Sequence, residues 1–292
     1  AAGNRSAPSA AQCARTPDLT PPTAPQHAVA RASSDRSVEV QWQASTDNVK
    51  VEKYEVVRGG SVVSEPAGAW TEEQELHPGV RYCYAVRAMD PAGNRSPPSA
   101  AACATTPDVT PPTVPDAVAA QPVSASAMFL AWEPSSDDVA VDGYEVVGDG
   151  AVVATVTASD AVASGLAPGK HCFRVRAFDG AGNRSALSSA ICGVTADPST
   201  PPAPFRLRAV PDSEKAVRLT WHPSEQPGIV YRIYWEDGKN IGTTRGTGFS
   251  AIGLKPGERH CYQVGAVDEH GLESPRTLEA CAAARTQSLS SR

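Results

Sequence analysis

Hydrophobic and polar residues alternate with a period of two along short segments of this chain. The pattern is clearest in residues 81–89, where Tyr82, Tyr84, Val86 and Ala88 share one face of an extended segment. Alternation with a single apolar face is typical of a half-buried antiparallel β-strand. No segment shows a convincing 3.6-residue period, so we expect an all-β chain of short strands.

Turn chemistry separates the predicted strands. Arg58-Gly59-Gly60 follows the run YEVVR, and Pro78-Gly79 precedes the run RYCYAVRA. Gly adopts the positive φ of tight turns and Pro fixes φ, so both residues mark chain reversals. About seven such strands fit into roughly 90 residues, which predicts a sandwich of two sheets.

The same pattern returns at a period of 89 or 90 residues, as the spacing of Trp42, Trp132 and Trp221 shows. A unit of this size can bury its own core, unlike the repeat of about 20–45 residues in a solenoid. We therefore predict an array of three small domains. Their ranges are 19–107, 108–196 and 197–286, and residues 287–292 form a tail.

Several motifs of this repeat resemble those of fibronectin type III domains. They are the Pro-Pro opening, the Trp of the second predicted strand, the Tyr of the third and the Leu-x-Pro-Gly before the sixth. The stretches TPPTAP, TDNV, YEVVRGG and AMDPAGNRS are similar to the versions found in secreted bacterial proteins, often beside polysaccharide-degrading or adhesive modules. The resemblance covers essentially the whole chain. It implies tandem immunoglobulin-like β-sandwiches in an elongated array, extracellular or at the bacterial cell surface.

One position departs from the family pattern. The corner tyrosine of the family matches Tyr82, whereas His171 and His260 stand near this place in domains 2 and 3. The resemblance therefore implies the corner hydrogen bond, which joins the tyrosine hydroxyl to the backbone, for domain 1 and not for the other two.

Residues 1–18 repeat the end of a domain. The segment AAGNRSAPSAAQCARTPD copies residues 91–108 almost letter for letter, so we expect it to be the C-terminal strand of a truncated preceding domain. The chain is then a fragment of a longer array. In a second interpretation, this strand completes a sheet of another molecule, and the chain self-assembles by strand addition. The first is favoured because domain 3 already has a final strand.

The cysteines of each domain are 20 positions apart and centred on a loop glycine, at Gly93, Gly182 and Gly271. In a bulge-free hairpin, residues equidistant from the turn lie opposite each other, within reach of a disulfide. We therefore predict three disulfides between the last two strands, on the face away from the core. They are Cys83–Cys103, Cys172–Cys192 and Cys261–Cys281.

These disulfides imply an oxidising compartment, outside the cell, on its surface or in a periplasm. Each would stabilise its domain by roughly 3 kcal/mol on the chain-entropy model. No CxxC or HxxxH spacing of the kind that binds zinc occurs. Cys13 is left without a partner by the same count, and we predict that it is unpaired.

Catalytic signatures are absent from the sequence, which contains no GxSxG, no HExxH and no P-loop. The net charge of −6 has both signs scattered along the chain, and this disfavours a nucleic-acid partner. The sequence contains no run of 18 apolar residues, so it does not predict membrane insertion. We expect a protein that is not an enzyme and that holds no cofactor, with calcium as the one exception considered.

Carboxylates occur in loops that this fold brings to one pole, where the chain enters each domain. Calcium takes six to eight oxygen ligands, and an ion at this pole would stiffen the junction between domains. Alternatively, these side chains only cap turns. Domain 3 lacks the motif, with Ser224-Glu225-Gln226 in its place. The candidate ligands are Asp18, Asp47 and Asp90 in domain 1 and Asp108, Asp137, Asp138 and Asp179 in domain 2.

The repeated tryptophans alternate with polar neighbours, so we expect them in the core. Trp70 and Trp235 lie off the repeat and are better candidates for exposed aromatic side chains, although they are too isolated to define a carbohydrate platform. Domain 3 is the divergent unit, and a ligand-binding surface is expected there first. Its candidate residues are Tyr234, Trp235 and Arg245.

Pro-rich linkers at 16–22, 106–112 and 197–202 predict short, semi-rigid connectors. Two functions follow. The favoured one is a non-catalytic spacer that holds other domains of the same polypeptide apart or belongs to a surface fibre. The alternative is an adhesion module that binds a polysaccharide or a surface protein.

Overall fold

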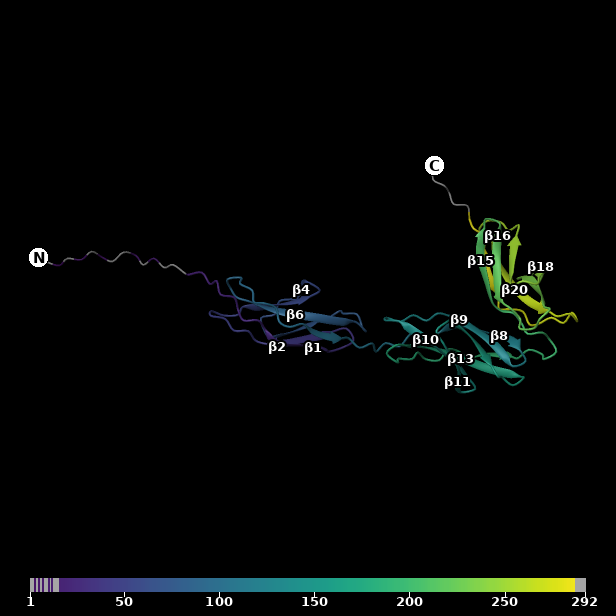
Figure 1. The fold of residues 1–292 in the computed structure, drawn as a ribbon, viewed down its shortest axis with the longest axis horizontal. Helices are drawn as coiled ribbons and strands as arrows, with labels where there is room; N and C mark the ends of the chain where they lie inside the picture. Colours follow the sequence, from purple (N-terminus) through teal and green to yellow (C-terminus); the bar gives the residue numbers. More distant parts are fainter. Residues whose placement is uncertain are drawn as a thin grey trace, which may run out of the picture. The chain divides into compact units, whose positions relative to one another are not determined.

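The computed structural model describes residues 16–286 and the single positions 3, 5, 7, 10 and 12. Within this part, the chain forms three sets of seven strands, β1–β7, β8–β14 and β15–β21 (Figure 1). The chain divides into two compact units, residues 1–109 and 110–292. Residues 16–286 contain no helix that could cross a lipid bilayer.

The first unit holds one sandwich, called the first sandwich below. Its sheets have the strand orders β1-β2-β5 and β4-β3-β6-β7, and all paired strands are antiparallel. The bounds are β1 (Gln26–Ala32), β2 (Val38–Gln43), β3 (Lys53–Arg58), β4 (Ser61–Ser64), β5 (Trp70–Glu73), β6 (Arg81–Met89) and β7 (Ala102–Thr105).

The second unit holds two further sandwiches with the same strand order, called the second and the third. The second consists of β8 (Asp116–Ser124), β9 (Ala127–Glu133), β10 (Val141–Gly148), β11 (Ala151–Val156), β12 (Asp160–Ser164), β13 (Lys170–Asp179) and β14 (Ile191–Val194). The third consists of β15 (Phe205–Ser213), β16 (Ala216–His222), β17 (Val230–Trp235), β18 (Asn240–Thr244), β19 (Gly248–Ile252), β20 (Arg259–Val267) and β21 (Ala280–Ala283).

Three strands facing four in this order is the arrangement of a fibronectin type III sandwich, so the predicted fold class is confirmed. The alternation in β6 is also confirmed, because its residues are alternately exposed and buried from Arg81 to Ala88. The Gly59-Gly60 turn has φ of 58° and 86°, the left-handed conformation that joins β3 to β4 in a tight hairpin.

Each core is built around an edge-to-face pair of Trp and Tyr. The repeated tryptophans are 5–6% exposed, which confirms their predicted burial. Their ring centroids lie 5.2, 5.3 and 5.4 Å from those of the paired tyrosines. Each tyrosine hydroxyl accepts a backbone N–H from the loop that precedes its strand. The pairs are Trp42–Tyr54, Trp132–Tyr144 and Trp221–Tyr231.

The connection between the last two strands of each sandwich is not the bulge-free hairpin that the sequence analysis assumed. In the first sandwich, Ser96 and Ser99 accept hydrogen bonds through their hydroxyls from the backbone N–H groups of Ala88 and Val86. Ser99 also returns a backbone N–H to the carbonyl of Val86. Side-chain hydroxyls thus replace part of the ladder, and regular pairing resumes at the cysteines. Ser185, Ser188, Ser274 and Thr277 repeat this arrangement.

The first strand of each sandwich begins with a β-bulge. His27, Ala117 and Arg206 have positive φ of 52°, 49° and 53°, and the strand register shifts around each of them. Non-glycine residues rarely adopt this conformation, and a bulge re-aims the side chain that it carries. In the third sandwich that side chain is the guanidinium of Arg206.

The linker 197–202, predicted as a short, semi-rigid connector, contains a turn. The carboxylate of Asp197 accepts hydrogen bonds from the backbone N–H and the hydroxyl of Ser199, and Thr200 donates its N–H to the carbonyl of Asp197. An Asp side chain that bonds the backbone two residues on is a common turn former, and here it outweighs the preference of proline for extension.

Candidate functional site

Three disulfides close the last hairpin of each sandwich. Their cysteines lie directly opposite each other in the strand register, with Cα–Cα distances of 4.1, 4.0 and 3.9 Å. The pairs are those that the spacing predicts: Cys83–Cys103, Cys172–Cys192 and Cys261–Cys281. Cys13 lies outside the described residues, as does most of the segment 1–18 considered for strand addition.

The corner position confirms one expectation and corrects another. The hydroxyl of Tyr82 accepts the backbone N–H of His77 at 2.9 Å, as the family resemblance implies. The second sandwich keeps a hydrogen bond of this kind, because His171 Nε2 lies 2.7 Å from the carbonyl oxygen of Ala167 and must carry the proton to donate to it. In the third sandwich, His260 stacks on Trp235 instead.

The acidic residues predicted for the first sandwich do come together. One carboxylate oxygen from each of Asp18, Asp47 and Asp90 lies within 4.8 Å of the other two. Two ligand oxygens on one calcium ion, each about 2.4 Å from it, are separated by at most about 4.8 Å. The spacing is therefore compatible with a shared cation.

Hydrogen bonds within this cluster also fit a turn-capping role. Asp90 is fully buried and accepts hydrogen bonds from the backbone and the side-chain amide of Asn94. Burial opposes ionisation of Asp90, but these bonds outweigh it and lower the pKa, so the carboxylate stays charged. Asp47 caps its own turn through Oδ2. Its other oxygen, Oδ1, is buried without a hydrogen-bond partner among the described residues.

The candidate ligands of the second repeat are divided between the two units, with Asp108 in the first and the others in the second. Asp137 caps its turn through Oδ1, Asp138 accepts a hydrogen bond from the hydroxyl of Thr110, and Asp179 is bonded by Asn183 as Asp90 is by Asn94. The third sandwich has the same loop cap at Asp268.

The candidate residues Tyr234, Trp235 and Arg245 are not assembled into one site. Tyr234 and Trp235 are neighbours on β17 and face opposite sides of its sheet. The ring of Trp235 packs against the core cluster and stacks on His260 with centroids 5.4 Å apart. Arg245 is exposed in the turn between β18 and β19. Trp235 is therefore less exposed than the sequence analysis expects.

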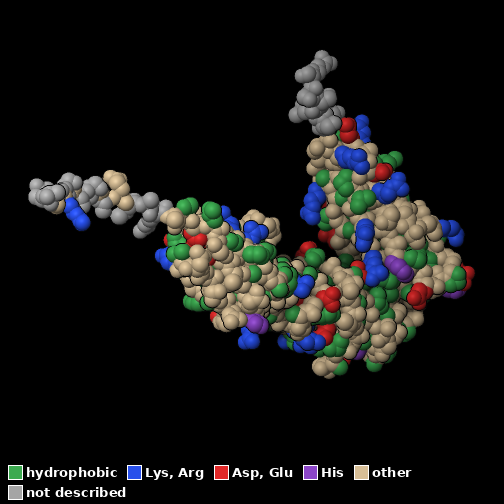
Figure 2. All heavy atoms as spheres, turned by 60° about the vertical axis from the view of Figure 1, so that its left-hand side comes forward, with side chains coloured by type: hydrophobic (Ala, Val, Ile, Leu, Met, Phe, Trp, Pro, Cys, Tyr) green, Lys and Arg blue, Asp and Glu red, His purple; other side chains and the backbone are tan. Residues whose placement is uncertain are grey.

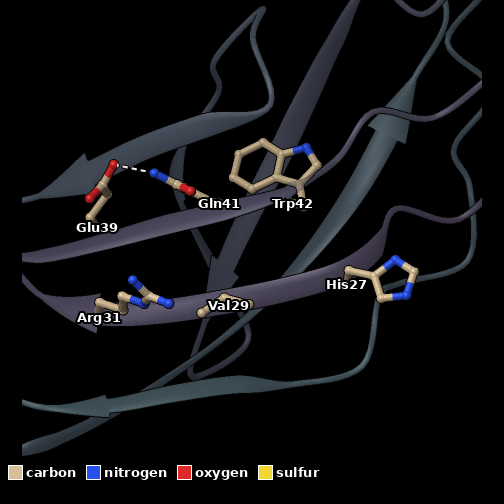
Figure 3. A pocket seen from close by; sticks show the side chains of 6 residues that line it. All are labelled: His27, Val29, Arg31, Glu39, Gln41 and Trp42. Carbon is tan, nitrogen blue, oxygen red and sulfur yellow. Dashed lines mark hydrogen bonds between the residues drawn. The ribbon is translucent and has the colours of Figure 1, made fainter.

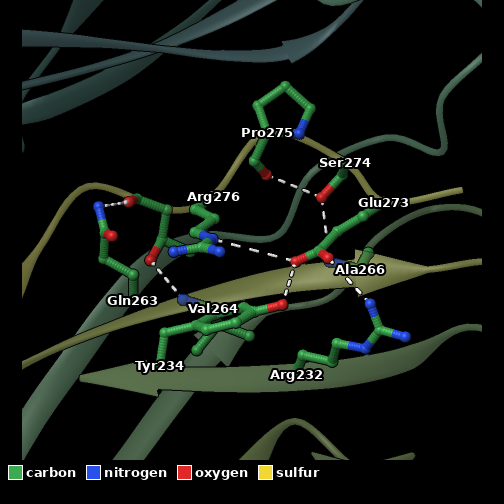
Figure 4. Close-up of polar contacts among 10 residues, drawn as sticks. Arg232, Tyr234, Gln263, Val264, Ala266, Glu273, Ser274, Pro275 and Arg276 are labelled. Atoms are coloured by element: carbon green, nitrogen blue, oxygen red, sulfur yellow. Dashed lines mark hydrogen bonds and ion pairs between the residues drawn. The ribbon is translucent and has the colours of Figure 1, made fainter. Parts of the chain in front are cut away.

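Tyr234 lies under a polar network on the outer face of the third sandwich (Figure 4). The guanidinium of Arg276 lies 3.5 Å from the centroid of its ring, and the ring is 6% exposed. The Tyr234 hydroxyl donates a hydrogen bond to the Glu273 carboxylate at 2.6 Å. The same carboxylate accepts a hydrogen bond from Arg232 at 3.0 Å. Gly265 leaves room for this carboxylate, since a Cβ there would lie 2.5 Å from Glu273 Oε1.

This network is a charge-reversed version of an ion pair in the other sandwiches. Glu55 binds Arg95 in the first, and Glu145 binds Arg184 and Arg176 in the second. Burial would raise the pKa of Glu145, but the hydrogen bonds from both arginines outweigh it and lower the pKa. The equivalent pair in the third sandwich is Arg232 and Glu273. The contact is thus retained while its polarity is exchanged.

The second and third sandwiches contact each other through an apolar cluster, called the joint below. Phe129 of β9 and Phe205 of β15 are 4% and 9% exposed, and their ring centroids lie 5.3 Å apart. Val123 belongs to the same cluster, and Leu278 packs against it. Phe129 lies on the outer face of the β12-β9-β8 sheet, where a solvated sandwich would carry a polar residue.

A buried glutamine completes the joint. Gln121 is 2% exposed, and its amide donates to the carbonyl of Pro204 at 2.7 Å and accepts the N–H of Leu278 at 3.0 Å. Arg206, turned by its bulge, forms an ion pair with Asp160. The side-chain nitrogen and oxygen of Gln121 therefore both have hydrogen-bond partners in the third sandwich, as buried polar groups require. No sequence motif indicated this contact.

The first sandwich carries the most exposed tryptophan of the described residues, Trp70, which is 60% exposed. It lies on β5, where it pairs with Gln41 of β2. Gln41 also lines a hollow of about 240 Å³ on the outer face of β1 and β2 (Figure 3). Figure 2 shows charged side chains of both signs scattered over the visible surface, without a basic stripe. The hollow is lined by His27, Val29, Arg31, Glu39, Gln41 and Trp42.

No family model matches the chain, but several curated proteins are similar to it. Exoglucanase B of Cellulomonas fimi is 33% identical over 273 residues, which is 88% of this chain and 25% of that protein. Exoglucanase A of the same organism is 35% identical over 292 residues, 94% of this chain and 33% of that protein. Chitinase A1 of Niallia circulans is 37% identical over 191 residues, 63% of this chain and 27% of that protein.

Among solved structures, the chicken CNTN1 FN1–FN3 domains align with 91% of this chain, at 20% sequence identity and a TM-score of 0.35. The chain spans about a quarter to a third of the length of these three curated relatives. Its described residues thus form tandem β-sandwiches of the fibronectin type III arrangement, and over most of its length the chain is similar to parts of bacterial exoglucanases and chitinases.

Proposed function

We propose that the chain is a non-catalytic spacer within a larger, secreted bacterial protein that acts on a polysaccharide. Its role is to hold other domains of that polypeptide at a defined separation outside the cell. Support comes from the relatives, which are named as exoglucanases and chitinases and of which this chain matches only a part. The disulfides support an oxidising location.

The joint is the observation that carries this proposal. A spacer must resist bending, and a flexible tether would need no contacts between neighbouring sandwiches. Here Phe129, Phe205 and Gln121 are buried between the second and third sandwiches as they would be in a domain core. Relative motion of the two would expose apolar rings and break two hydrogen bonds of a buried amide, which costs free energy.

Backbone ¹⁵N relaxation of the full chain tests the spacer. We expect the second and third sandwiches to share one rotational correlation time, because the joint makes them one body. Independent correlation times would refute a stiff spacer. In parallel, the chain is incubated with cellulose and chitin and assayed for released reducing sugar. We expect none, and sugar release at a rate above a no-protein blank would refute the non-catalytic assignment.

Calcium binding by the first sandwich is a second proposal. It is favoured by the spacing of Asp18, Asp47 and Asp90 and by the buried Asp47 Oδ1, which has no hydrogen-bond partner among the described residues. The test is the melting temperature of the chain with and without millimolar calcium. We expect a rise that Asp47→Asn abolishes, since the amide keeps the turn cap but loses the charge. An unchanged melting temperature of the unsubstituted chain would exclude the site.

A further inference from the structure

The outer face of the β1-β2-β5 sheet carries an ordered row of side chains. Val29 pairs with Gln41 on β2, and Gln41 pairs with Trp70 on β5. Directly opposed residues point to the same face, so the three form a line across the sheet about 10 Å long, at about 4.8 Å per strand. Val29 is 45% and Trp70 60% exposed, which leaves two apolar surfaces on either side of an amide.

A second, polar row runs parallel to the first. Arg31, Glu39 and Glu72 are opposed in the same way, two residues further along each strand and therefore about 7 Å away. Gln41 donates its side-chain amide to Glu39 at 2.6 Å, which links the two rows. Donors and acceptors thus alternate along the outer face of β1 and β2 (Figure 3). The exposed indole of Trp70 lies on the neighbouring strand β5.

The equivalent face of the second sandwich is a contact surface. Positions in the two sandwiches can be matched by counting back from the repeated Trp42 and Trp132. Phe129 then corresponds to Glu39, and Gln121 corresponds to Arg31. In the second sandwich these residues are covered by the third. The face of the first sandwich keeps the same geometry but carries charged groups and amides in place of the apolar cluster. Its composition suits a hydrated partner better than another buried protein surface.

We propose that this face binds a polysaccharide chain, with a sugar ring stacked on Trp70 and hydroxyl groups bonded to Gln41, Glu39 and Glu72. The aliphatic C–H groups of a pyranose carry partial positive charge and match the negative face of an indole. Each hydroxyl both donates and accepts, as a surface of alternating donors and acceptors requires. The choice of β-linked glucose or N-acetylglucosamine polymers rests on the proposed function.

Charge and shape separate this ligand from other classes. The polar row has two carboxylates and one guanidinium, so it repels phosphate and does not favour nucleic acid or an anionic membrane. The hollow on this face measures about 240 Å³, which is smaller than the roughly 300–1,000 Å³ of a typical small-molecule site. A neutral polymer that lies along the sheet needs neither a basic patch nor a deep pocket.

Calorimetric titration of the full chain with cellohexaose, with the N-acetylglucosamine hexamer and with α-linked dextran tests the proposal. We expect weak binding of at least one β-linked oligosaccharide and none of dextran. Trp70→Ala should weaken that binding by about tenfold or more, since the loss of a stacked aromatic contact is of this order. The matched control is Ile252→Ala, which removes an exposed apolar side chain from the equivalent strand of the third sandwich and should leave binding unchanged.

Three outcomes would overturn the proposal. They are no binding of either β-linked hexamer at millimolar concentration, equal affinity of Trp70→Ala and the unsubstituted chain, or equal loss in the Ile252→Ala control. Sedimentation of the chain alone tests a protein partner, and a dimer abolished by Trp70→Ala would assign the face to self-association instead. The relaxation test of the joint is independent, so failure of the sugar face and failure of the spacer are distinguishable.

Discussion

Replacing Gln121 by leucine should uncouple the second and third sandwiches. The substitution keeps the approximate volume of the side chain but removes the two hydrogen bonds to Pro204 and Leu278. The buried carbonyl of Pro204 and the partly buried N–H of Leu278 then lose their partner, at a cost of about 1–3 kcal/mol each. We therefore expect the joint to lose at least about 2 kcal/mol, a factor of about thirty in its opening equilibrium.

Hydrogen exchange of the full chain measures this loss of joint stability at the amide of Leu278. The backbone N–H of Leu278 is bonded to the side chain of Gln121, so its exchange should accelerate by about the same factor if opening limits protection. The matched control is Gln43→Leu, at an exposed position of β2 whose side chain hydrogen-bonds to His27. Surface changes of this kind alter stability by no more than about 0.5 kcal/mol.

Unchanged exchange at Leu278 in Gln121→Leu would refute the reasoning, because the amide would then contribute nothing to the joint. A general acceleration across the core strands of the second sandwich would also refute it, since the loss would then lie within that domain. Phe129→Ala provides an independent check. It should accelerate exchange at the same position by removing the ring that packs on Phe205.

Three further outcomes follow from the ion pairs and disulfides. Glu273→Arg should destabilise the third sandwich by about 1–3 kcal/mol, because it adds a third guanidinium beside those of Arg232 and Arg276. Adding Arg232→Glu should restore most of the loss in chemical denaturation. Glu145 has a lowered pKa, so its contribution is complete above the ordinary carboxyl pKa and is lost as the pH falls through the lowered value. Glu145→Gln should flatten the dependence of the melting temperature on pH in that acidic range, and an unchanged slope would contradict the assignment. Replacing Cys172 and Cys192 together by serine should cost the second sandwich about 3 kcal/mol, and a loss spread equally over all three sandwiches would argue against independent closure.

Periodicity along the chain determined much of the fold. A two-residue alternation at 81–89, with glycine turns and a tryptophan every 89 or 90 residues, specifies short antiparallel strands in repeated sandwiches. Cysteine spacing identified the three disulfides. The spacing did not reveal the serine and threonine hydroxyls that shape the connection between the two cysteines of each pair. Local patterns suffice to specify the strands because alternation and turn residues act within a few positions, although strands that pair, such as β3 and β6, are distant in sequence.

Tertiary structure decided which surfaces meet. Gln121 and Leu278 are 157 positions apart, and neither belongs to a repeated motif, so nothing local indicated their hydrogen bond. The sequence predicted the exposure of Trp70 correctly, whereas the stacking of Trp235 on His260 and the covering of Tyr234 by Arg276 depend on neighbours from other strands. A sequence therefore specifies each sandwich through its own alternation, whereas the use of an outer face depends on whether another part of the chain covers it.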